Sequence, residues 1–233
     1  MPLVIMELTM GDVPKLQVPT IGIAQSTARF PVRRIFCVGR NYAEHAREMG
    51  SDPNIEPPFF FTKPADAVVA SGLRLPFPTR TVDLHHEVEL VIALGAGGVD
   101  VKPADAPAMI FGYAVGIDLT RRDMQAEAKK TGRPWDMSKG FDHSAPIGPL
   151  TRGVPPPKGA IALTIDGNLR QAGDLQDMIW SVADIIAFLS TYVAAAAGDL
   201  IFTGTPAGVG PIRRGEQVRG TIDGIDPIEV TFE

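Results

Sequence analysis

Apolar positions recur along this chain in two ways, one typical of helices and one typical of strands. Between residues 182 and 193, apolar side chains follow helical spacing behind Ser181 and Asp184, which form a helix-capping pattern. A second helix is predicted over residues 41–49, with Asn41 as its N-cap, and a third over residues 120–130.

Shorter runs, in which apolar residues are continuous or alternate with polar ones, predict strands. The runs are PVRRIFCVG (31–39), VELVIAL (88–94), MIFGYAVGIDL (109–119), AIALTIDG (160–167), DLIFTG (199–204), EQVRGTIDGI (216–225) and IEVTFE (228–233). Asp-Gly pairs at 166–167 and 223–224 are hairpin signals. Because strands outnumber helices and no regular strand–helix alternation is present, the sequence predicts an α+β fold dominated by sheet.

Length and charge narrow the class of protein. The 233 residues fit one domain over 31–233, preceded by an N-terminal segment, 1–30, whose weak signals indicate short strands packed on that domain. The net charge is −5 without a basic cluster, so we expect no nucleic-acid partner. No apolar run approaches the roughly 20 residues that span a bilayer. The N-terminus lacks signal-peptide features, so a cytoplasmic protein without a membrane partner is expected.

Glu87 and Glu89 stand at the start of the apolar run 90–94. Side chains alternate along a strand, so both carboxylates point to the same face. Two carboxylates this close repel each other, and burial of an unpaired charge costs several kcal/mol, so either a cation lies between them or one is protonated. A hard divalent cation with oxygen ligands satisfies this requirement. The alternative is a strand end where both glutamates are solvated.

Asp118 is the candidate for a third ligand. It ends a strand face whose other residues are Gly112, Ala114 and Gly116, whereas the opposite face is apolar. Small residues leave room either for close packing of a neighbouring strand or for a ligand. We interpret the carboxylate at the end of this row as favouring a ligand or ion. Three carboxylates would suit Mg²⁺, with Mn²⁺ or Ca²⁺ as alternatives.

His45 and Glu48 are three residues apart on the predicted helix over 41–49, so they share one helical face. A carboxylate bonded to one imidazole nitrogen makes the other a better base, and such a pair can activate water. A surface contact between neighbouring side chains is the alternative. Lys139 lies among Gly, Pro and polar residues, where a lysine is ordinarily solvated.

Seven stretches, taken together and in this order, resemble the fumarylacetoacetate hydrolase superfamily. They are CVGRNYAEHAREMG, PPFFFTKPADAVV, HHEVELVIALG, GYAVGIDLTRRDMQ, GRPWDMSKGFDHSAPIGP, RQAGDLQDMIWSVADII and GDLIFTGTPAGVGP, which span roughly residues 33–212. The resemblance implies a mixed β-sandwich roll over residues 31–233 that forms a homodimer and uses Mg²⁺ or Mn²⁺. It also implies residue roles: His45, Glu48 and Lys139 as catalytic residues, Glu87, Glu89 and Asp118 as metal ligands, and Lys63, Gln125 and Thr205 as ligand contacts.

Within the superfamily, the stretches GRNYAEHAREMG, PPFFF and TRRDMQ are similar to those of acylpyruvases and fumarylpyruvate hydrolases. The implied reaction is metal-dependent hydrolysis of a C–C bond in a small 2,4-diketo acid, with fumarylpyruvate giving fumarate and pyruvate in aromatic (gentisate) catabolism. The distal carboxylate needs a cation, for which Arg40, Lys63 or Arg121 is available. Alternatives at the same site are oxaloacetate decarboxylation and 2-hydroxy-diene-dioate isomerisation. A non-catalytic binding module is the alternative of another class.

Overall fold

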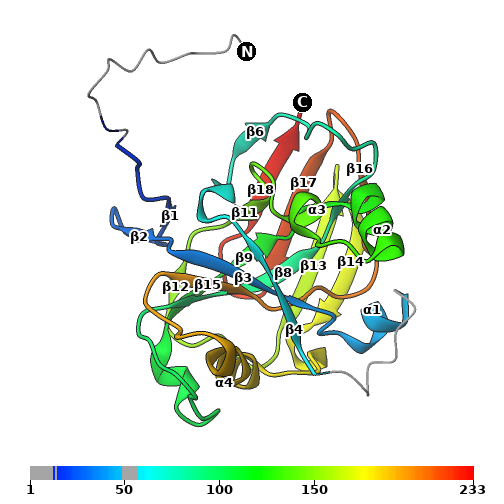
Figure 1. Cartoon of the computed structure of the whole chain (residues 1–233). Helices are drawn as coiled ribbons and strands as arrows, with labels where there is room; N and C mark the ends of the chain where they lie inside the picture. The colour runs from blue at the N-terminus through cyan, green and yellow to red at the C-terminus, as the bar shows by residue number, and fades with distance from the viewer. Residues whose placement is uncertain (1–12, 14, 49–56) are drawn as a thin grey trace.

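The computed structural model describes residues 13, 15–48 and 57–233, and sheet dominates them (Figure 1). The strands are β1 (Thr20–Gly22), β2 (Arg29–Pro31), β3 (Arg34–Gly39), β4 (Phe59–Lys63), β5 (Val68–Ala70), β6 (Leu73–Leu75), β7 (Leu84–His86), β8 (Val88–Leu94), β9 (Ile110–Ile117), β10 (Thr120–Arg121), β11 (Ala145–Ile147), β12 (Thr151–Arg152), β13 (Ala160–Ile165), β14 (Asn168–Asp174), β15 (Asp199–Phe202), β16 (Gly210–Ile212), β17 (Gln217–Ile222) and β18 (Ile228–Phe232). The helices are α1 (Ala43–Glu48), α2 (Arg122–Thr131), α3 (Asp136–Lys139) and α4 (Val182–Tyr192), with 3₁₀ turns η1 (Ala65–Ala67), η2 (Ala106–Met109) and η3 (Leu175–Asp177).

Two larger sheets form the body of the molecule. One has the strand order β4-β3-β15-β8-β9-β11-β5, with β12 paired to β9, and the other has the order β14-β13-β17-β18-β6. Antiparallel pairs are mixed with the parallel pairs β15–β3, β11–β5 and β18–β6. Strands β13, β17 and β18 pack against β8 and β9, and apolar side chains of both sheets form one core. The predicted sheet-dominated α+β roll is confirmed.

Local sequence signals placed several elements correctly. The β13–β14 hairpin turns at Asp166 and Gly167, whose φ angles of 49° and 79° are both positive, as a tight two-residue hairpin turn requires. Helix α4 begins after Ser181, whose hydroxyl accepts the Asp184 N–H while the Asp184 carboxylate accepts the Ser181 N–H. Helix α2 ends at Gly132, which has the left-handed conformation common after a helix.

The prediction of Asn41 as a helix N-cap is wrong. Helix α1 begins at Ala43, and the Asn41 amide instead donates to the carbonyl oxygens of Trp180, at 3.0 Å, and Thr203, at 2.8 Å. Its side-chain oxygen accepts the Trp180 N–H at 2.7 Å. Since Asn41 is fully buried, these bonds tie the start of α1 to the segment before α4 and to the end of β15. The predicted end of this helix lies outside the described residues.

The row of small residues on β9 is covered by protein, so its interpretation as space for a ligand is wrong. A Cβ atom at Gly116 would lie 2.5 Å from Cγ2 of Val91 and 2.8 Å from the ring of Phe202. The backbone of β12 closes Gly112 in the same way. These glycines therefore allow close packing of neighbouring strands. Asp118, at the end of the row, reaches the candidate site described below.

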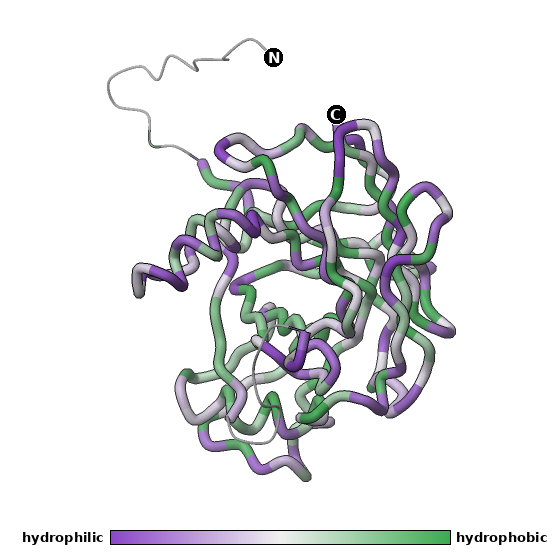
Figure 2. The backbone as a smooth tube through the Cα atoms, turned by 90° about the vertical axis from the view of Figure 1, so that its right-hand side faces the viewer, coloured by the Kyte–Doolittle hydropathy of each residue, from purple (hydrophilic) through white to green (hydrophobic). Residues whose placement is uncertain are grey.

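Polar and apolar stretches alternate over short distances along the chain (Figure 2), as expected for short strands that each bury one face.

In the N-terminal segment, β1 pairs with β2, and Ile21 and Phe30 join a second apolar cluster. Cys37 is buried in the same cluster. Among the residues that the structure describes, no helix is long and apolar enough to cross a membrane.

Candidate active site

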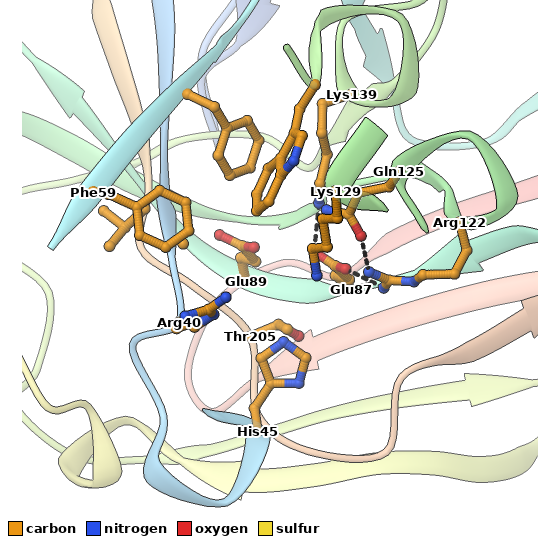
Figure 3. Close-up of a pocket in the computed structure, with 14 residues that line it drawn as sticks. Arg40, His45, Phe59, Glu87, Glu89, Arg122, Gln125, Lys129, Lys139 and Thr205 are labelled. Atoms are coloured by element: carbon orange, nitrogen blue, oxygen red, sulfur yellow. Dashed lines mark hydrogen bonds and ion pairs between the residues drawn. The ribbon is translucent and has the colours of Figure 1, made fainter. Parts of the chain in front are cut away.

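A pocket lies where the end of β3, helix α1, the start of β8 and the α2–α3 segment meet (Figure 3). The side chains singled out from the sequence that line it are Arg40, His45, Glu87, Glu89, Gln125, Lys139 and Thr205. Lining residues that the sequence analysis missed include Phe59, Phe61, Arg122, Lys129 and Trp135.

Glu87, Glu89 and Asp118 are brought together at this pocket. Each offers one carboxylate oxygen, and these three oxygens lie within 4.8 Å of one another. Strand β8 runs antiparallel to β9 with Glu89 opposite Gly116, so the start of one strand meets the residues that follow the other. All three residues are buried, with exposed fractions of 5% for Glu87 and 1% for the others.

Two positive side chains hold Glu87 in its ionised form. Nζ of Lys139 lies 2.8 Å from Oε2 of Glu87 and 2.7 Å from Oδ2 of Asp118, and the Arg122 guanidinium also pairs with Glu87. Burial alone would raise the pKa of Glu87, but Lys139 and Arg122 outweigh it and hold this pKa well below its usual range. Burial opposes the charged form of Lys139, yet Asp118 and Glu87 raise its pKa, so the lysine is a fixed positive charge.

Glu89 is placed differently from Glu87. Its Oε2 accepts the N–H of Gly204 at 2.7 Å, but no lysine, arginine or histidine of the described residues forms an ion pair with it. Burial, together with the negative charges of Asp118 and Glu87, raises the pKa of Glu89 well above its usual range. A buried carboxylate that lacks a cationic partner, next to two other carboxylates, is a donor set that fits a hard divalent cation.

Lys63 and Arg121 lie outside the lining of the pocket. Nζ of Lys63 is 2.8 Å from Oδ1 of Asp118 and donates to the carbonyl oxygens of Leu119 and Lys139, and its side chain has no exposed surface. Lys63 therefore forms an ion pair with Asp118 from outside the pocket lining. The Arg121 guanidinium donates to a carbonyl oxygen of α3 and lies over the ring of Phe141, 4.3 Å from its centre.

His45 and Glu48 form the predicted dyad geometry. Nδ1 of His45 lies 3.1 Å from Oε2 of Glu48, which also accepts the N–H of Gly208 at 3.3 Å. With Nδ1 in this contact, Nε2 is the nitrogen left for a substrate or water. His45 is only 6% exposed and its ring points into the pocket next to Thr205 (Figure 3), which does not fit a mere surface contact.

Gln125 and Thr205 are held in fixed orientations at the pocket. The hydroxyl of Thr205 donates to the carbonyl oxygen of Val88 at 2.8 Å and accepts from Nε2 of Gln171 at 2.8 Å. The side-chain oxygen of Gln125 accepts from the Arg122 guanidinium at 2.6 Å, which leaves the Gln125 NH₂ group as a donor towards the pocket.

Sequence comparison assigns this fold and this site to a family. The family described as fumarylacetoacetate (FAA) hydrolase C-terminal matches residues 34–233. The chain belongs to the fumarylacetoacetate hydrolase family, whose members are enzymes and include hydrolases, isomerases and decarboxylases.

Individual relatives of similar identity carry different activities. Fumarylpyruvate hydrolase of Ralstonia sp is 42% identical over 77% of this chain and 95% of its own length. Mitochondrial oxaloacetate tautomerase FAHD1 of Mus musculus is 41% identical over 83% of this chain and 88% of its own. The crystal structure of fumarylpyruvate hydrolase from Pseudomonas aeruginosa, in complex with Mn²⁺ and pyruvate, is 49% identical, with a TM-score of 0.92 over 96% of this chain and 99% of that chain.

Proposed function

We propose that this protein is a divalent-metal-dependent fumarylpyruvate hydrolase that acts as a homodimer in aromatic catabolism. The observation that carries the proposal is buried His45, which is paired with Glu48 and lines the same pocket as Glu87 and Glu89. A binding module has no use for such a base beside a cation site. The similarity to fumarylpyruvate hydrolases supports the choice of acyl group, and Mg²⁺ is the proposed metal, with Mn²⁺ as the second candidate.

The chain supplies most of the required chemistry. A divalent cation held by Glu87, Glu89 and Asp118 would act as a Lewis acid towards the oxygen atoms of the 2-oxo acid end of the substrate. His45, oriented by Glu48, takes a proton from water through Nε2. The hydroxide attacks the distal carbonyl carbon, and the C–C bond breaks with its electron pair leaving on the three-carbon fragment. Protonation of this pyruvate enolate gives pyruvate, and the acyl fragment leaves as fumarate.

The role of His45 can be tested by substitution. His45→Ala should lower kcat for pyruvate release from fumarylpyruvate by about 10²–10⁴, the range for loss of a general base. Arg47→Ala is the matched control, since Arg47 is an exposed residue of the same helix and does not line the pocket. A kcat near that of the unchanged protein would rule out His45 as the base.

Oxaloacetate decarboxylation is the second candidate, because the mitochondrial oxaloacetate decarboxylase of Dictyostelium discoideum is 39% identical to this chain, close to the 42% of the Ralstonia hydrolase. Decarboxylation of oxaloacetate forms the same pyruvate enolate without a hydrolytic water, so it should survive His45→Ala better than hydrolysis does. Pyruvate release should therefore be measured from fumarylpyruvate, acetylpyruvate and oxaloacetate, with Mg²⁺ and with EDTA. Fast, metal-dependent release from fumarylpyruvate would support hydrolysis, whereas turnover of oxaloacetate alone would favour this second function.

A further inference from the structure

The charges that line the pocket are unevenly balanced. The cations Arg40, Arg122, Lys129 and Lys139 outnumber the carboxylates Glu87 and Glu89. Arg122 and Lys139 are both bonded to Glu87. Lys129, in contrast, forms no ion pair with any carboxylate in the part of the chain that the structure describes. The pocket therefore carries a positive side chain beyond those that its own acids use.

Lys129 lines the pocket beside an aromatic wall. Its Nζ lies 5.2 Å from the centre of the Trp135 ring, and that ring packs edge-on against Phe59 and Phe61, with centroid distances of 5.5 and 5.9 Å. Lys129 is nevertheless an exposed residue. Lys129 and the buried carboxylates Glu87 and Glu89 thus line the same pocket.

The surroundings of Lys129 favour an anion. Burial, followed by repulsion from Arg122 and Arg40, lowers the pKa of the Lys129 ammonium group. A carboxylate placed among these cations would relieve the repulsion. Of the cations considered from the sequence, Lys63 supports Asp118 and Arg121 lies outside the pocket lining, whereas Arg40 lines the pocket together with Lys129.

We infer that Lys129 binds the distal carboxylate of the substrate, so that the pocket selects acylpyruvates with an acid group at the end of the acyl chain over those with a neutral end. The inference rests on the proposed function, because it takes the 2-oxo acid end to lie at Glu87, Glu89 and Asp118. It deepens that function by assigning the residue that distinguishes dicarboxylic from monocarboxylic substrates.

The test compares kcat/KM for fumarylpyruvate, which has a distal carboxylate, with kcat/KM for acetylpyruvate, which has a methyl group there. Lys129→Met should lower the ratio of the two constants about ten-fold, equivalent to about 1.4 kcal/mol, and Lys129→Arg should restore most of it. Lys130→Met is the matched control, because Lys130 is the next residue of α2 and, like Lys129, is exposed, but it does not line the pocket. The control should keep the ratio of the unchanged protein.

A binding measurement separates this inference from the proposed function. Fumarate and crotonate share a carbon skeleton and differ by one carboxylate, and Trp135 fluorescence, in a Trp180→Phe background, reports occupancy beside Lys129. Fumarate should bind about ten-fold tighter than crotonate, and Lys129→Met should remove the difference. If the protein hydrolyses neither diketo acid but keeps this Lys129-dependent preference, only the proposed reaction fails. If it hydrolyses both and Lys129→Met leaves the ratio unchanged, or Arg40→Met alone lowers it, the inference on Lys129 is overturned.

Discussion

Glu87→Gln and Glu89→Gln each replace a carboxyl group of the same buried cluster by a neutral amide, yet they should change the stability of the metal-free protein in opposite directions. Glu87 is paired with Lys139 and Arg122. Glu89 accepts the Gly204 N–H and has no cationic partner among the described residues. Loss of charge therefore breaks ion pairs at Glu87 but relieves repulsion at Glu89.

The gain in stability caused by Glu89→Gln can be estimated from the distances between the carboxylates. The carboxylate oxygens of the cluster lie within 4.8 Å of one another, and two unit charges at that distance repel by about 3.5 kcal/mol at an effective dielectric constant of about 20. Protonation of Glu89 and the field of Lys139 offset part of this repulsion, so we expect a net gain of about 1–2 kcal/mol on removal of the charge. Glutamine keeps an oxygen to accept the Gly204 N–H. For a chain of this length the melting temperature, Tm, should rise by about 3–6 °C.

The loss of stability caused by Glu87→Gln should be larger than the gain from Glu89→Gln. Removal of one partner from a buried ion pair costs about 3–5 kcal/mol, because the remaining charges stay buried without compensation. In this variant Lys139 keeps Asp118 as a partner, whereas Arg122 loses its carboxylate. We expect the lower end of the range, and a fall in Tm of about 10 °C.

Thermal unfolding followed by circular dichroism, in EDTA and in Mg²⁺ or Mn²⁺, measures both effects. At a metal concentration about 100-fold above Kd, the unchanged protein should gain about 2.7 kcal/mol, and both variants should lose most of that gain. Glu127→Gln, at an exposed position of α2, is the control and should behave like the unchanged protein. Similar falls in Tm for both variants in EDTA, or a full metal-dependent rise in either, would refute this assignment of charges.

Two further predictions concern the scaffold, and both are measured by urea denaturation. Gly116→Ala should destabilise the protein by about 1–3 kcal/mol, because the new methyl group would lie 2.5 Å from Cγ2 of Val91. Asn41→Ala should cost about 2–4 kcal/mol, because it leaves buried carbonyl oxygens of Trp180 and Thr203 without their donor. In either case, a free energy of unfolding within 0.5 kcal/mol of that of the unchanged protein would contradict the packing described here.

Elements that depend on local signals were predictable from the sequence, and those imposed by a distant partner were not. Helix α4 carries its own capping box, and β8 contains the continuous apolar run 90–94 and has the predicted bounds, 88–94. Strand β14 lacks apolar alternation and forms because the β13 hairpin pairs it edge to edge. At Asn41 the local capping pattern is overridden by hydrogen bonds to segments far along the chain.

The candidate site divides in the same way. Glu87 and Glu89 could be placed together because they are two residues apart on a strand, whereas the proximity of Asp118 depends on the register of β8 against β9. The row of small residues on β9 did indicate Asp118, but these residues allow close packing of neighbouring strands and do not leave space for a ligand. Lys129 and Trp135 had no local signal, because they reach the pocket only through the packing of α2 on β7 and of α3 on β4.

The division of charge explains how three carboxylates can be buried together before a cation binds. Lys139 lies between Glu87 and Asp118, and Lys63 lies on the far side of Asp118, so two of the three acids are compensated by the protein itself. Both lysines are buried, and Lys63 also donates to the backbone carbonyl of Lys139, so these ion pairs are part of the packed fold. Glu89 alone among the three has no such partner in the described ranges 15–48 and 57–233. The three carboxylates are therefore already in place for a cation. A divalent ion would compensate mainly Glu89, because the protein already compensates Glu87 and Asp118. For the same reason, Glu89→Gln should stabilise the metal-free protein and Glu87→Gln should destabilise it.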